Sequence, residues 1–63
     1  MAKTVQFKAE LTEYQALQFA QFLKRVRLDH YKELSPTVED AYEMQAAGEI
    51  IRDALAEAGF APR

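Results

Sequence analysis

One short segment of alternating polarity, with no second one to match it, limits most strongly what this chain can fold into. The segment is KTVQFKAELT, residues 3–12. Apolar and polar side chains alternate along it, with Val5, Phe7, Ala9 and Leu11 on one side and Thr4, Gln6, Lys8 and Glu10 on the other. A period of two residues is typical of a strand with one buried face. We therefore predict a strand over residues 3–11.

A lone strand needs a partner for its backbone. Its donors and acceptors stay open unless it is short and frayed or is completed from outside the chain. A chain of 63 residues also has a small core, which dimerisation would enlarge. We predict a mostly helical α+β fold of order β-α-α, whose strand pairs across the two-fold axis of a homodimer. The inward residues of this dimer ribbon would be Val5, Phe7 and Ala9.

The first helix is predicted from residue 12 to about residue 28. Thr12 followed three positions later by Gln15 is typical of a capping box. Apolar residues then recur at helical spacing, namely Ala16, Phe19, Ala20, Leu23 and Val26, with Leu17 and Phe22 on the flanks. The phase slips near Arg27, so two outcomes stay open: a break followed by a short helical piece, or one helix to Leu34. Phe7, Phe19 and Phe22 are predicted to lie in the core.

The second long helix is predicted over residues 36–58. Proline favours the first helical position, and either Ser35 or Thr37 can cap the helix, the latter with Asp40 three positions on. Gly59 stands where a left-handed residue commonly ends a helix. Small residues along it, Ala41, Ala47 and Gly48, leave room for a close crossing by another helix. The whole chain is predicted to be one domain, residues 1–63.

Composition narrows the compartment and the chemistry. The chain has no cysteine, so it has neither a disulfide framework nor a thiolate metal site, and we expect a cytoplasmic protein. No apolar run approaches the roughly 18 residues of a membrane span, and MAKTVQF lacks the apolar core of a signal peptide. We therefore expect no membrane partner.

An enzyme is not expected from this set of residues. His30 is the only histidine, and its near carboxylates cannot complete a transition-metal site within one chain. The two glycines are isolated, so no phosphate-binding loop is present, and no nucleophile has a matched base. We predict no catalytic, cofactor-binding or metal-binding residue.

The segment VQFKAEL followed by two helices resembles the ribbon-helix-helix repressors. That resemblance implies a dimer whose outward ribbon residues read bases in the major groove, while the second helix clamps a phosphate with its amino end. Here Glu39 and Asp40 put carboxylates beside Thr37 at that end. The nucleic-acid face implied by this alternative, with the basic end of the first helix added, consists of Thr4, Gln6, Lys8, Lys24 and Arg25.

The segments LTEYQALQFAQFLKRV and VEDAYEMQAAGEIIRDALAEAGFAPR resemble short uncharacterised proteins of bacterial plasmids and integrative elements. The resemblance covers nearly the whole chain and brings no assigned activity. It implies a context in which small proteins inhibit or modulate host defence, as anti-CRISPR proteins do, or regulate transfer.

Charge is divided unevenly along the chain, whose net charge is −2. Basic residues outnumber acids before residue 35, and the reverse holds after it. The second long helix carries a set of acids that could mimic nucleic-acid phosphates and dock on a basic partner: Glu39, Asp40, Glu43, Glu49, Asp53 and Glu57. The alternative is a merely solvated helix face. The sequence thus favours a non-enzymatic protein that binds a host protein or nucleoprotein complex, with a DNA-binding regulator as the alternative.

Overall fold

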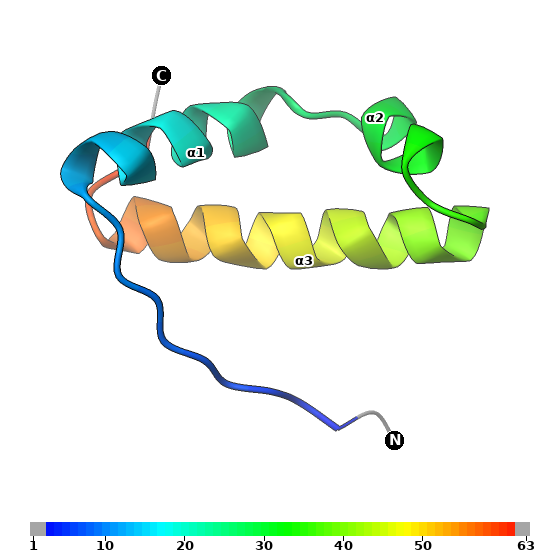
Figure 1. Cartoon of the computed structure of the whole chain (residues 1–63), viewed down its shortest axis with the longest axis horizontal. Coiled ribbons are helices and arrows are strands. Elements are labelled where there is room, and N and C mark those ends of the chain that lie inside the picture. Colours follow the sequence, from blue (N-terminus) through cyan, green and yellow to red (C-terminus); the bar gives the residue numbers. More distant parts are fainter. Residues whose placement is uncertain (1–2, 62–63) are drawn as a thin grey trace.

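The computed structural model describes residues 3–61, which form three helices: α1 (Glu13–Arg25), α2 (Leu28–Glu33) and α3 (Val38–Glu57). α1 and α2 both pack against α3, and they lie along the same side of it (Figure 1). The chain is therefore a two-layer arrangement, with one long helix below two shorter ones.

The predicted strand is absent, which corrects the α+β, β-α-α prediction. Residues 3–11 form an extended segment, hereafter the arm, and within residues 3–61 no segment is a strand. No hydrogen bond joins the backbone of residues 4–11 to the rest of the described chain. Alternation fixes which side chains share a side, but a strand also needs a second backbone to pair with. The predicted strand is therefore wrong, and the described fold is helical. The residues predicted for the dimer ribbon, Val5, Phe7 and Ala9, lie on the exposed arm.

α1 begins with the two hydrogen bonds of a capping box. The Thr12 hydroxyl accepts from the Gln15 backbone N–H, and the Thr12 N–H donates to Gln15 Oε1, both at 3.0 Å. Two of the free amides at the start of the helix are satisfied in this way. These bonds also fix the point at which the arm leaves the helix (Figure 1).

The break between α1 and α2 falls at Val26 and Arg27, which are both extended. Of the two outcomes left open by the sequence, the chain adopts the break. The backbone N–H of Arg27 donates to Nδ1 of His30 at 3.0 Å, so the only histidine helps to start α2. The break turns Tyr31 of α2 toward α3, where it is half-buried beside Gly48.

α3 is capped at both ends by the residues that flank it. The Thr37 hydroxyl accepts from the Asp40 backbone N–H at 3.1 Å, so Thr37, rather than Ser35, is the N-cap. Gly59 has a φ of 102°, and the N–H of Phe60 donates to the carbonyl of Leu55 at 2.8 Å. Together with the bond from Gly59 to Ala56, this is a Schellman ending.

The core is small, and small side chains make up most of it. Among the described residues, only Ala16, Ala20, Leu23 and Ala41 are buried. Gly48 allows the closest approach, because a Cβ at that position would overlap the Tyr31 hydroxyl and touch Leu23. Phe7, Phe19 and Phe22 are all exposed, so their prediction as core residues is wrong. The crossing at Gly48 is filled by Leu23 of α1 and by Tyr31 of α2.

Candidate functional site: two separate surfaces

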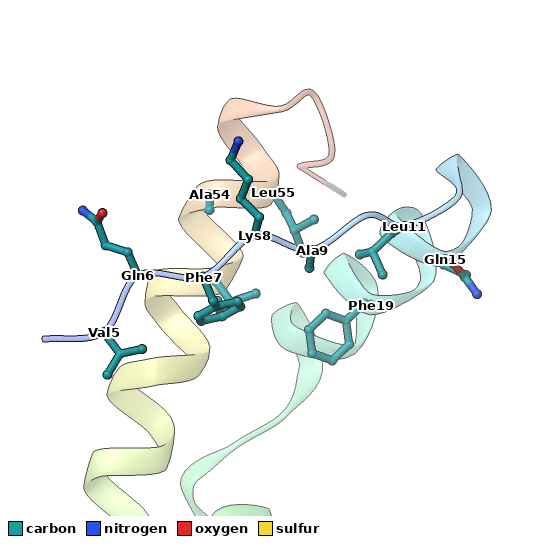
Figure 2. A pocket seen from close by; sticks show the side chains of 11 residues that line it. Val5, Gln6, Phe7, Lys8, Ala9, Leu11, Gln15, Phe19, Ala54 and Leu55 are labelled. Atoms are coloured by element: carbon teal, nitrogen blue, oxygen red, sulfur yellow. The ribbon is translucent and has the colours of Figure 1, made fainter.

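The first candidate surface is a groove of about 1280 Å³ between the arm, α1 and α3. Its walls are mostly apolar and come from three places in the sequence (Figure 2). The arm contributes Phe7 and Leu11, α1 contributes Phe19, and α3 contributes Leu55. The groove exists because the arm runs beside the carboxyl-terminal half of α3 without packing tightly on it.

The alternation of the arm decides which of its side chains line this groove. Figure 2 shows Val5, Phe7 and Ala9 on the side of the arm that faces the helices, while Gln6 and Lys8 point the other way. The apolar side nevertheless remains open, because Phe7 keeps 72% of its surface exposed. The arm is therefore sorted into two sides as the sequence indicates, without being buried.

A second groove, of about 610 Å³, lies between α1 and α2. Phe22, Tyr31 and Leu34 line it, and Leu34 is 81% exposed. The rings of Phe19 and Phe22 are stacked with centroids 5.8 Å apart, and they join the two grooves. We call the continuous surface formed by Phe7, Leu11, Phe19, Phe22 and Leu34 the apolar face.

The second candidate surface is on α3. Tyr42, Ala46 and Ile50 are spaced four residues apart, so they lie in one row along the helix. This row is on the side opposite Ala41, Gly48 and Leu55, which pack inward. Five acids flank the row, and all of them are exposed: Glu39, Glu43, Glu49, Asp53 and Glu57. We call these eight residues the outward face of α3.

The structure groups most of the predicted acidic set but not all of it. Asp40 follows Glu39 by one position and so points away from the outward face, toward the other flank of the helix. Its backbone N–H donates a hydrogen bond to the hydroxyl of Thr37, the N-cap residue. The docking surface expected from the sequence is thus smaller by one carboxylate.

The residues of the alternative nucleic-acid face do not form one surface of the expected kind. Thr4, Gln6 and Lys8 lie on the unpaired arm, whereas Lys24 and Arg25 lie in the last turn of α1. The 13 residues of α1 place about 20 Å between that turn and the point where the arm begins. Within residues 3–61, the strand that would present the three arm residues to a major groove is not formed.

Across residues 3–61, no group of three or more histidine, cysteine or acidic side chains is placed to hold a metal ion. The same part of the chain has no helix that is long and apolar enough to cross a membrane.

The sequence reasoning missed the apolar face and the apolar row on α3. The width of the apolar stripe on α1 could have indicated the apolar face, because Phe22 and Leu17 extend this stripe beyond what one partner helix can cover. Tyr42 and Ile50 lie outside the inner stripe of α3, and the sequence analysis did not place them together on one face. Four-residue spacing between exposed apolar residues was the sign that could have found them.

A family model described as a family of unknown function (DUF7706) matches residues 1–63, and the chain therefore belongs to that family. No curated protein and no solved structure matches the chain.

Proposed function

We propose that this DUF7706 protein is a non-enzymatic interaction protein that binds a basic surface of a host protein or nucleoprotein complex through the outward face of α3. Binding would modulate the target, as expected for an anti-defence inhibitor from a mobile element. The proposal assigns the protein to the cytoplasm and gives it no cofactor.

The observation that carries the proposal is an apolar row surrounded by acids. Tyr42 is 53% exposed and Ile50 is 69% exposed, although neither is needed to hold α3 on its neighbours. Single exposed apolar residues are ordinary on a solvated surface, but these two lie in one row on the same helix face. An aromatic and an aliphatic anchor within a charged rim is the usual composition of a protein-binding surface.

The charge of this face selects the class of partner. Five carboxylates on about five turns of helix give a strongly negative strip, which attracts basic surfaces and repels polyanions. A channel that normally holds nucleic acid is one such basic surface. The alternative function, sequence reading by a ribbon, has lost its structural support because the arm is not paired.

The test compares two charge reversals of equal size in a capture experiment with lysate of the protein's own host. Glu43→Lys combined with Asp53→Lys reverses the outward face, and Glu10→Lys combined with Asp29→Lys reverses two acids elsewhere. We expect the first pair to lower capture of the bound partner at least about tenfold, because rim charges set both association rate and partner choice. The second pair should leave capture unchanged.

Ile50→Ala and a salt series complete the test. Loss of the Ile50 anchor should also weaken capture, and capture by the wild type should fall as salt rises because charges are screened. Circular dichroism shows whether each variant keeps its helices. Equal capture by the wild type and the Glu43/Asp53 variant would refute the proposal.

A further inference from the structure

The chain exposes far more surface than a folded monomer of its mass. Its accessible surface is 5766 Å², whereas a compact protein of 7.2 kDa exposes about 4,100 Å². The excess is roughly 1,700 Å² per chain. Its Cα radius of gyration is 12.7 Å, against about 10.6 Å for a compact domain of this length.

The exposed surface includes the apolar face. Phe22 is 55% exposed and Phe19 is 43% exposed, although both belong to the apolar stripe of α1. The grooves on either side of this stacked pair connect it to the arm and to Leu34. Monomers seldom leave a continuous apolar surface of this extent open to water.

The exposed area in excess of a compact monomer matches the area that each chain of a stable homodimer buries. If each of two copies covers about 1,700 Å² of the other, the interface totals roughly 3,400 Å², within the range of obligate homodimers. On the apolar face, the exposed and stacked rings of Phe19 and Phe22 lie beside the grooves that they line.

The distribution of charge favours the apolar face over the outward face of α3 for pairing with a second copy. Arg25 and Glu33 border the second groove, so a second copy meets both signs of charge there. The charged residues of the outward face of α3 are all acids, and two such faces would repel each other.

We propose that the apolar face is the interface of a two-fold homodimer, in which each copy covers the Phe19–Phe22 pair and the adjoining groove of the other. The occupant of the groove is thus a second copy of this chain. The interface is held by side chains, with the backbone of the arm left unpaired. It lies apart from the outward face of α3, which stays free for another partner.

Sedimentation equilibrium of the full chain tests this with two matched pairs of exposed residues. The wild type should be a dimer at micromolar concentration. Phe19→Ala combined with Phe22→Ala should raise the dimer dissociation constant by about 30-fold or more, as the loss of a central anchor does. Tyr42→Ala combined with Ile50→Ala removes equally exposed side chains from α3 and should change that constant less than twofold.

Each outcome either supports or overturns the assignment of the apolar face as the dimer interface. A monomeric wild type up to millimolar concentration would overturn the proposal, even if another protein later proved to fill the groove. A dimer weakened by the Tyr42/Ile50 pair as much as by the Phe19/Phe22 pair would overturn the choice of face. Phe22→Ala alone guards against misfolding, because this single change keeps every buried residue and should still raise the dissociation constant. The capture experiment on the charge-reversal variants is independent of these results.

Discussion

At the scale of single residues, the two glycines of the chain are required for opposite reasons. Gly48 lies inside α3 with ordinary helical backbone, and it is needed because Tyr31 occupies the space of a side chain. Gly59 has open space around it, and it is needed because its φ of 102° disfavours any side chain. The sequence indicates the helix end at Gly59 and a close crossing at Gly48, but only the structure shows that Tyr31 fills that crossing.

Replacing Gly48 separates steric conflict from helix propensity. Gly48→Ala gains about 1 kcal/mol of helix propensity but forces the Tyr31 hydroxyl aside, at a cost of about 1–3 kcal/mol. We expect a net loss of stability in the wild-type background. With Tyr31→Phe already present, the hydroxyl is gone and the same change should stabilise by up to about 1 kcal/mol.

Thermal unfolding at one fixed protein concentration measures both effects. A change of 1 kcal/mol shifts the midpoint by about 4–8 °C in a domain of this size, so a reversal of sign is readily seen. The packing of Tyr31 on Gly48 would be contradicted if Gly48→Ala had the same effect in both backgrounds.

Among single residues, those with local roles were predictable. Thr12, Thr37 and Gly59 act on backbone groups within a few positions, and short patterns reveal such roles. Tyr31 could not be placed in the same way, because its position depends on how the break at Val26 and Arg27 turns α2. The exposure of Phe19 and Phe22 depends on what the rest of the chain fails to cover.

At the scale of elements, the arm shows what an alternating pattern can and cannot indicate. The pattern correctly separates Phe7 from Gln6 and Lys8, because successive side chains of any extended chain point to opposite sides (Figure 2). It does not supply a second backbone. The prediction of a strand with one buried face is therefore wrong, although the two sides of the arm carry the side chains that the pattern assigns to them.

Hydrogen exchange of the backbone amides tests this description of the arm. We expect the amides of residues 4–11 to exchange at nearly unprotected rates, because none is bonded within the described chain. Amides in the middle of α3 should be strongly protected under the same conditions. The measurement is made at a concentration where self-association is complete. Protection at alternate arm amides would show that the arm pairs with another strand.

At the scale of the whole molecule, the three helices and four buried residues of the described part of the chain are too little to account for a stable fold alone. The small core follows from the sequence, which puts alanine and glycine at the helix crossings and leaves the phenylalanines outside. Length and composition indicated that the chain needs help from a second copy. The surface on which that copy would sit could be located only once the arm and the break were placed.

The most direct test of this account is the thermal midpoint of the wild type at several concentrations. Unfolding of a dimer releases two chains, so its midpoint rises with concentration. With an unfolding enthalpy of about 0.7 kcal/mol per residue, we expect a rise of about 6 °C for each tenfold increase. A midpoint that stays constant from micromolar to millimolar concentration would show that the chain folds alone, and would contradict the assignment of the apolar face as a dimer interface.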